Sequence, residues 1–282
     1  MEYGEKRGYM SRDVSVLMSV YHREKPQYLD VALKSIWIDQ TLTPKEIVLV
    51  KDGPLPAALE EVISKWLKTA GERLKIVPLE TNCGLAVALN NGLAACTSDY
   101  VARMDTDDIA LPARLETQVS YLEKNPSVDV VGSAMAEVDE SGQPRNKIVK
   151  YPLSHDECFD LFRKRDPLAH PTVMFRKTFF EKAGIYDSSV RADEDSLLWM
   201  KGFNAGCRFA NVPDVLLNFR VTSDFFKSRR SGVSCAMELF RNRLKIIDEL
   251  DYRADSYVYA VLLLVVYLLP QGLKKFAYRV FR

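Results

Sequence analysis

Three carboxylates within four residues, at positions 105–108, are the strongest chemical signal in the chain. Asp105, Asp107 and Asp108 directly follow residues 100–104, whose apolar character predicts a buried strand. Neighbouring negative charges repel one another and cost stability unless a cation or several donors compensate. Hard ions such as Mg²⁺ and Mn²⁺ prefer carboxylate oxygens, often together with substrate phosphates. The pattern therefore predicts a divalent-metal and diphosphate site. The alternative is that these aspartates only cap the helix expected near Pro112.

Polar residues also end two other predicted strands. Ser19, Tyr21 and His22 lie at the end of the strand at 14–20, and Asp52-Gly53 follows the strand at 46–50. In open α/β sheets, ligands bind in the crevice outside the carboxyl ends of the strands. We therefore expect these positions and the aspartates to meet at one edge of a sheet.

Glycine-rich phosphate loops are absent from the sequence. No segment matches the P-loop pattern G-x-x-x-x-G-K-S/T or the dinucleotide pattern G-x-G-x-x-G. A diphosphate would therefore be held by the metal and by basic side chains.

Strand and helix patterns alternate through the first half, which is typical of an α/β fold with a mostly parallel sheet flanked by helices. The predicted strands cover 14–20, 46–50, 74–78, 100–104 and 128–134, and the predicted helices cover 26–37, 57–69, 86–95 and 112–124. After Glu137 the pattern changes to that of an α+β unit. It predicts a hairpin turn at 139–142, short strands at 169–175, 208–211 and 215–221, and a long helix at 232–250.

Composition excludes several classes of protein. The 282 residues are 47% hydrophobic, which excludes a mainly disordered chain, and the net charge of +1 argues against a nucleic-acid-coating protein. Five scattered cysteines without a Cys/His cluster predict neither a disulfide framework nor a zinc site. Residues 1–10 are polar and do not resemble a secretion signal, so we expect a cytoplasmic location.

Charge is unevenly distributed along the chain. Residues 225–282 contain eleven Lys/Arg and five Asp/Glu, a local net charge of +6, which leaves −5 on residues 1–224. The division predicts a catalytic domain at 1–224, with a nucleotide half at about 11–135 and an acceptor half at about 136–224, and a basic, apolar helical extension at 225–282.

Six short motifs occur in a specific order over roughly the first 220 residues. They are Val-Leu-Met-Ser-Val-Tyr at 16–21, Glu-Ile-Val-Leu-Val-Lys-Asp-Gly at 46–53, Asn82-x-Gly84 with Asn90-x-Gly92, Ala-Arg-Met-Asp-Thr-Asp-Asp at 102–108, His170-Pro171-Thr172, and Glu194-Asp195 with Leu197-Leu198-Trp199. In these segments the chain resembles the inverting family 2 glycosyltransferases, which have the nucleotide-sugar-binding GT-A fold. The resemblance extends to bacterial enzymes that build exopolysaccharide, capsule or O-antigen.

The resemblance implies a nucleotide side of the site. Ser19 and Tyr21 would lie near the uridine, and Asp52 would accept the uracil N–H. Of the clustered aspartates, one would bind the ribose and another a Mn²⁺ or Mg²⁺ ion, with Asp107 favoured for the metal and Asp108 the alternative. Lys51 and His22 depart from the family pattern, which often has Asp and Asn there. The full nucleotide-side set is Ser19, Tyr21, Asp52, Asn82, Gly84, Asn90, Arg103, Asp105, Asp107 and Asp108.

The resemblance also implies the catalytic base and the acceptor side. An acceptor hydroxyl must lose its proton as it attacks the sugar, and Asp195 is the candidate carboxylate base. The alternative interpretation of residues 193–195 is a helix N-terminus whose acids suit the helix dipole, and both can hold at once. A mobile loop from Arg220 onward would bring cations to the diphosphate. The acceptor-side and lid set is Glu194, His170, Trp199, Arg220, Arg229 and Arg230.

The C-terminal segment predicts contact with a membrane surface. Residues 257–269 form an apolar run of thirteen residues, too short to span a bilayer core, and residues 274–282 interleave cations with aromatics. The alternative is packing against the catalytic domain or against a second copy of the chain, so a homo-oligomer stays open.

Together these features predict a UDP-sugar-dependent hexosyltransferase, with galactose or glucose favoured. Its acceptor would be a polyprenyl-diphosphate-linked oligosaccharide at the inner face of the cytoplasmic membrane. The alternative is a nucleotide-binding scaffold subunit of a polysaccharide assembly complex, which would release no UDP from any donor.

Overall fold

The computed structural model describes residues 12–222 and 232–269, which form a nine-stranded sheet with helices on both faces. Its first four strands are neighbours in the order β3-β2-β1-β4, with parallel pairings throughout. A helix separates each strand from the next, because parallel pairing needs a long crossover. The predicted elements of this part are confirmed, with ends shifted by at most two residues. They are β1 (Val14–Tyr21), α1 (Pro26–Trp37), β2 (Glu46–Asp52), α2 (Ala57–Ala70), η1 (Gly71–Arg73), β3 (Leu74–Pro78), α3 (Leu85–Ala95) and β4 (Tyr100–Arg103).

The remaining strands run in both directions, so the complete sheet is mixed. Strand β8 is antiparallel to β4 and β6, β6 is parallel to β9, β5 is antiparallel to β9, and β7 is antiparallel to β6. The predicted hairpin turn joins β6 to β7. The elements are β5 (Ile109–Ala110), α4 (Arg114–Lys124), β6 (Val130–Val138), β7 (Pro144–Val149), α5 (His155–Phe162), η2 (His170–Thr172), β8 (Met174–Arg176), α6 (Thr178–Ala183), α7 (Glu194–Asn204) and β9 (Phe209–Arg220).

Two segments correct the predicted secondary structure. The strands predicted at 208–211 and 215–221 form the single strand β9, because the exposed Pro213 and Asp214 occupy an irregularity where the register with β6 shifts after Ser133. The strand predicted at 169–175 begins instead with the turn η2. Pro171 has no N–H for a strand ladder, and β8 starts only at Met174.

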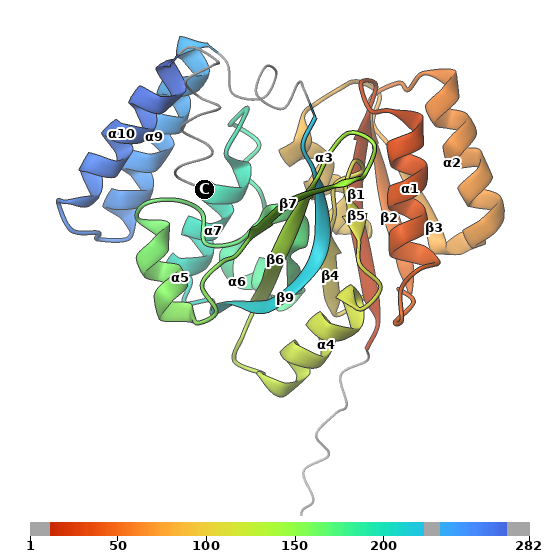
Figure 1. The fold of residues 1–282 in the computed structure, drawn as a ribbon, viewed down its shortest axis with the longest axis horizontal. Coiled ribbons are helices and arrows are strands. Elements are labelled where there is room, and N and C mark those ends of the chain that lie inside the picture. The colour runs from red at the N-terminus through yellow and green to blue at the C-terminus, as the bar shows by residue number, and fades with distance from the viewer. Residues whose placement is uncertain (1–11, 223–231, 270–282) are drawn as a thin grey trace, which may run out of the picture.

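The sheet separates two apolar cores (Figure 1). Helices α1, α2 and α4 contribute to one core, and α3, α5, α6 and α7 contribute to the other. Along β1, Val16 and Met18 face the first core and Leu17 the second, as strand alternation requires. Gly92 lets α3 lie directly on the sheet, because a Cβ there would be 2.4 Å from Leu17 Cδ1. The start of α3 is thereby held close to the carboxyl ends of β1 and β2.

Two C-terminal helices lie at the end of the molecule opposite α2 (Figure 1). Helix α9 (Val233–Glu249) confirms the long helix predicted at 232–250 and packs on α7. Helix α10 (Ser256–Leu268) contains most of the predicted apolar run and packs on α9. Among the described residues, the helices fall short of the length and apolar character needed to cross a membrane.

Candidate active site

The three polar strand ends predicted to share an edge do lie side by side. Tyr21 at the end of β1 is level with Asp52 at the end of β2, and β4 pairs with the other side of β1. Thr106 Oγ1 lies 3.4 Å from the Ser19 carbonyl oxygen, which connects the aspartate segment to β1. Tyr21 is 37% exposed at this edge, and its ring meets the ring of His22. The sheet thus forms the edge at which a ligand was expected.

Asp105, Asp107 and Asp108, hereafter the β4 cluster, bring carboxylate oxygens within 4.8 Å of one another. Asp105 forms an ion pair of 2.6 Å with the buried Arg103 guanidinium. Asp108 is completely buried, and its Oδ1 accepts a hydrogen bond of 2.9 Å from the backbone N–H of Arg220. Burial, together with repulsion from Asp107 and Asp105, holds the pKa of Asp108 well above its usual range. Negative charge on Asp108 is therefore unfavourable in this structure.

A divalent cation fits this donor set. In the described part of the chain, Asp108 Oδ2 is a buried oxygen without a hydrogen-bond donor, which is rare for a carboxylate unless a cation binds it. Arg114 is a completely buried cation whose guanidinium donates to the Arg103 carbonyl at 2.6 Å. Burial lowers the pKa of Arg114 to about 9, although Asp108 opposes this. Asp107 and Asp108 are the residues that would hold the metal.

Arg220 corrects one prediction, because it is a fixed part of the site and not a lid cation. It is 4% exposed, and its Nε donates to the Asp107 carbonyl at 2.8 Å. Its Nη1 donates to the carbonyls of Asp139 and Glu140, and its guanidinium stacks on the Tyr28 ring at 4.2 Å. Arg220 thus holds the backbone of the β4 cluster against the β6–β7 turn. The other predicted lid cations, Arg229 and Arg230, lie outside the described residues, as does Lys227.

Asp52 organises the loop that precedes α3. Its carboxylate accepts hydrogen bonds from Cys83 N at 2.7 Å, Gly84 N at 3.1 Å and Asn82 Nδ2 at 3.0 Å. The neighbouring Gly53 has φ 85° and is so close to this loop that a Cβ would lie 2.6 Å from Asn82 N. Asp52 and Gly53 therefore fix the loop in place, and the predicted contact of Asp52 with uracil stays a prediction.

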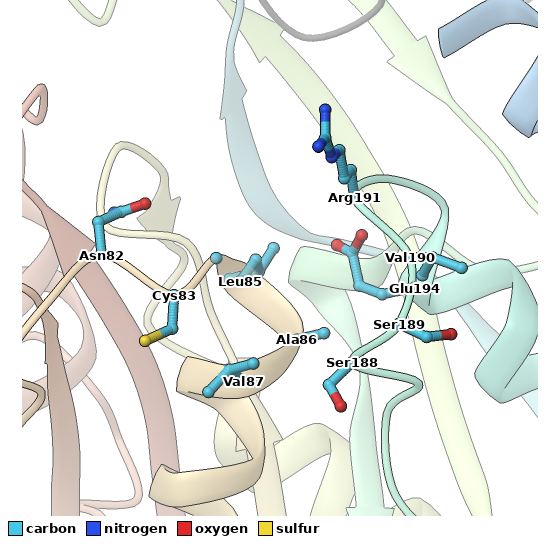
Figure 2. A pocket seen from close by; sticks show the side chains of 11 residues that line it. Asn82, Cys83, Leu85, Ala86, Val87, Ser188, Ser189, Val190, Arg191 and Glu194 are labelled. Carbon is cyan, nitrogen blue, oxygen red and sulfur yellow. The ribbon is translucent and has the colours of Figure 1, made fainter. Parts of the chain in front are cut away.

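A pocket of about 400 Å³ opens between this loop and the segment before α7 (Figure 2). Asn82 and Gly84 line one side with the first turn of α3, and Ser188 to Arg191 line the other with Glu194. The Glu194 carboxylate extends from the start of α7 toward α3 (Figure 2). Two predicted nucleotide-side residues and one predicted acceptor-side residue therefore share a single pocket.

The candidate base belongs to a second acidic group, Asp166, Asp193 and Asp195, hereafter the α7 cluster. Their carboxylate oxygens also lie within 4.8 Å of one another. Asp193 precedes α7 with φ 72°, a left-handed conformation that is uncommon outside glycine, and Asp195 accepts a 3.0 Å hydrogen bond from Ser196 N. Asp193–Asp195 lie at a helix N-terminus, as the alternative interpretation of these acids predicts. The catalytic role of Asp195 stays a prediction.

Tyr186 is a buried residue whose pKa depends on members of both clusters. It is 2% exposed, and its hydroxyl lies 2.8 Å from His170 Nε2. Burial raises the pKa of Tyr186; the charge of Arg103 lowers it, and the charges of Asp195, Glu194 and Asp105 raise it further.

Two predicted site residues have structural roles around Tyr186. Asn90 exchanges two hydrogen bonds, of 2.9 and 3.0 Å, with the Tyr186 backbone, so its amide ties α3 to the segment before α7. Trp199 is completely buried against Phe175 and His170, so its side chain packs in the core, and its predicted acceptor-side role stays a prediction. Its position on α7 follows from the apolar face of that helix.

Sequence reasoning missed Tyr186 and Asp166. Tyr186 belongs to no motif, and Asp166 ends the charged run Arg163-Lys164-Arg165-Asp166, which by itself indicates only a solvated surface segment. Folding brings each of them to the site. An adjacent signal existed for Asp166, because it lies four residues before the recognised His170-Pro171-Thr172 segment.

The sequence of this chain is similar to those of several known proteins. Residues 15–184 match the model of the family described as glycosyl transferase family 2. The amylovoran biosynthesis glycosyltransferase AmsE of Erwinia amylovora is 40% identical, over 94% of this chain and 97% of that protein. An Escherichia coli UDP-Gal:alpha-D-GlcNAc-diphosphoundecaprenol beta-1,3-galactosyltransferase is 31% identical, over 94% of each chain.

Solved structures show the same fold. Staphylococcus aureus TarS residues 1–349 in complex with UDP superposes with a TM-score of 0.63 at 20% identity, covering 91% of this chain and 70% of that one. The complex of the same protein with UDP-GlcNAc gives a TM-score of 0.64 at 18% identity, covering 91% and 71%. The fold is therefore the expected GT-A type. With its family match and these relatives, the chain belongs to glycosyl transferase family 2 and is a glycosyltransferase.

Proposed function

We propose that this glycosyltransferase moves a hexose from a UDP-sugar to a lipid-linked oligosaccharide in bacterial surface polysaccharide synthesis. The observation that carries the proposal is the presence of two aspartate clusters in one family 2 glycosyltransferase fold, one suited to a cation and the other containing the candidate base. The UDP complexes of TarS and the UDP-Gal donor in the name of the E. coli relative support the choice of nucleotide. The names of the E. coli and Erwinia relatives support the pathway, and the E. coli name supports the acceptor class.

The β4 cluster would hold the donor diphosphate through Mn²⁺ or Mg²⁺ bound by Asp107 and Asp108. A divalent ion there would stabilise the charge that develops on the leaving UDP. Arg103 fixes Asp105, and Arg220 fixes the backbone of Asp107 and the carboxylate of Asp108. The protein thus keeps three negative groups together at the position where a metal would bind.

Asp195 would remove the proton from the acceptor hydroxyl as that hydroxyl attacks the sugar carbon. The oxygen–carbon bond forms on one face while the bond from that carbon to the UDP oxygen breaks on the other, so the anomeric configuration inverts. Glu194 projects into the neighbouring pocket, where it would contact the donor sugar or the acceptor. Galactose or glucose is the sugar that we propose.

The acceptor would be reached at a membrane surface through α10. One face of this helix exposes Val258, Val261, Leu262, Val265 and Leu268, each between 49% and 58% accessible. Their spacing places them on a single stripe, and the sequence that follows contributes Lys274, Lys275, Arg279 and Arg282. Such a combination is typical of helices that lie on anionic lipid. We propose a peripheral location on the cytoplasmic membrane.

The decisive experiment measures UDP release and product formation with UDP-galactose or UDP-glucose, Mn²⁺ and a polyprenyl-diphosphate-linked acceptor. We expect turnover by the wild type and at least a roughly 10³-fold loss in Asp195→Asn, with UDP binding retained. Asp156→Asn on the exposed surface of α5 is the matched control and should keep full activity. Normal turnover by Asp195→Asn would show that another group is the base, and no UDP release with any donor would refute the proposed reaction.

Membrane contact has its own test. In flotation assays the wild type should bind vesicles containing anionic phosphatidylglycerol more strongly than neutral phosphatidylcholine vesicles. A Val261→Ser/Leu262→Ser/Val265→Ser variant should lose most of this binding, whereas Ile148→Ser, which changes a 56% exposed residue on β7, should not. Equal binding by the two variants would exclude α10 as the contact.

A further inference from the structure

Ser196 contacts all three members of the α7 cluster. It is completely buried, and its hydroxyl oxygen lies 2.6 Å from Asp166 Oδ1 and 2.8 Å from Asp193 Oδ1, so the two carboxylates share its one proton. Its backbone N–H donates to Asp195 Oδ1 at 3.0 Å. One residue of the first turn of α7 therefore contacts all three carboxylates. A shift of Asp166 would be transmitted through Ser196 to the candidate base.

Asp166 is in turn connected to the C-terminal helix α9. Arg243 on α9 is 5% exposed, and its Nη2 lies 3.6 Å from Asp166 Oδ1. Its Nη1 donates to the Phe162 carbonyl at 2.7 Å, and its guanidinium lies over the Phe162 ring at 5.4 Å. These contacts fix the orientation of the guanidinium. A positive charge in this place offsets repulsion among carboxylates that lie within 4.8 Å of one another.

We infer that Asp166 and Arg243 are positioning residues that hold Asp195 in place through Ser196. The inference rests on the proposed role of Asp195 as the base. Helix α9 would then help to position a catalytic residue. It lies beyond the residues matched by the family model and outside the catalytic domain predicted from sequence. Neither residue needs to touch the substrates, so their loss should slow proton transfer and leave donor binding intact.

Asp166 provides the first test. Asp166→Ala removes one of the two carboxylates at Ser196 Oγ and leaves the hydroxyl to Asp193 alone, and we expect kcat to fall roughly 10- to 100-fold, as for a base displaced by about 1 Å. The donor KM should change less than about twofold, a split that general unfolding would not produce. Asp166→Asn keeps an oxygen for the Ser196 hydroxyl and should recover most of the kcat. Wild-type kcat in Asp166→Ala, or a proportional loss in kcat and donor binding, would overturn the inference.

Arg243 provides the second test, which stands even if Asp166→Ala does not fold. Arg243→Met should lower kcat about tenfold at unchanged donor KM, and Arg243→Lys should recover part of the loss because it restores the charge without the planar fork. Arg241→Met, on the exposed side of the same helix, is the matched control and should behave as wild type. Equal kinetics of Arg243→Met and Arg241→Met would refute the inference. Asp195→Asn, measured in parallel, distinguishes this outcome from failure of the base assignment itself.

Discussion

The β4 and α7 clusters each hold three aspartates within 4.8 Å, yet they are built in opposite ways. The β4 cluster comes from four consecutive residues at the end of a strand, and it includes the completely buried Asp108. The α7 cluster joins a loop residue, Asp166, to a helix N-terminus, and all three of its members are half-buried. A group with one completely buried carboxylate suits a bound cation. A group whose carboxylates are all partly exposed suits proton transfer from an acceptor that must enter and leave.

Their supports differ in the same way. Arg103 and Arg220 hold the β4 cluster from the same sheet, one by an ion pair and the other through backbone contacts. Ser196 and Arg243 hold the α7 cluster from two different helices. The first arrangement lies within one sheet, where the pairing of β5 with β9 brings Arg220 next to the β4 cluster, and the second depends on how the C-terminal helices dock.

The largest expected effect is the loss of metal-dependent transfer in Asp107→Asn. Removing one charged ligand should cost about 4 kcal/mol of transition-state stabilisation, a roughly 10³-fold fall in rate. Titration of Mn²⁺ against UDP release measures it. A normal rate with an unchanged Mn²⁺ dependence would show that the β4 cluster does not carry the metal.

Asp108→Asn should separate function from stability. We expect transfer to fall about 100-fold, because Asp108 Oδ2 loses its charge. The metal-free protein should instead melt a few degrees higher, since a fully buried carboxylate repelled by Asp107 and Asp105 costs stability when ionised. Asparagine keeps the oxygen that accepts from Arg220 N. Thermal unfolding in EDTA measures the change, and a lower melting temperature would contradict the interpretation of this site.

Arg220→Met tests the support of the β4 cluster. Its guanidinium donates to the carbonyls of Asp107, Asp139 and Glu140, so its loss should lower the free energy of unfolding by about 2–3 kcal/mol. Arg220→Lys should not restore stability, because an ammonium group cannot reproduce the fork of donors. Urea unfolding measures both variants. Wild-type stability in Arg220→Met would return Arg220 to the role of a mobile cation.

The smallest effect concerns Glu46, a buried carboxylate whose charge is fully compensated. Burial would raise its pKa, but Lys75, Ser15 and Thr97 lower the pKa to about 2. Because the folded pKa is depressed, the stabilisation is present above the usual value of 4.5 and is lost as the pH falls toward 2. Glu46→Gln should therefore cost about 2 kcal/mol at pH 7 and nearly nothing at pH 2. A pH-independent difference would contradict this assignment.

Much of the fold could be predicted from sequence because its signals are local. The parallel strands β1 to β4 and their helices follow from periodicity, and the matching ends of β1 and β2 follow from the rule for parallel sheets. Segments that depend on partners were less predictable. The sequence predicts separate strands at 208–211 and 215–221, whereas pairing with β6 carries β9 through the Val-Pro-Asp segment at 212–214.

The same contrast applies to the site residues. Arg220 lies in the predicted strand at 215–221, within a basic segment, and the family resemblance implies a mobile cation there. In the structure it ends β9 and is buried against Tyr28 and the Asp107 backbone, which makes it a support of the β4 cluster. Trp199 stands in a recognised segment, but its face of α7 turns to the core. Residue type and neighbours along the chain do not determine which side of a helix or strand will be buried by the rest of the protein.

The sequence by itself determined the family, the α/β half of the fold and the β4 cluster, because each is recorded in short stretches of consecutive residues. The tertiary structure decided that Asp166 joins Asp195, that Tyr186 is buried against His170, and that Arg243 reaches the site from α9. The Ser196–Asp166 hydrogen bond joins residues 30 positions apart, and the Arg243–Asp166 contact spans a longer separation. Their formation depends on packing two cores against one sheet, and no local pattern encodes that packing.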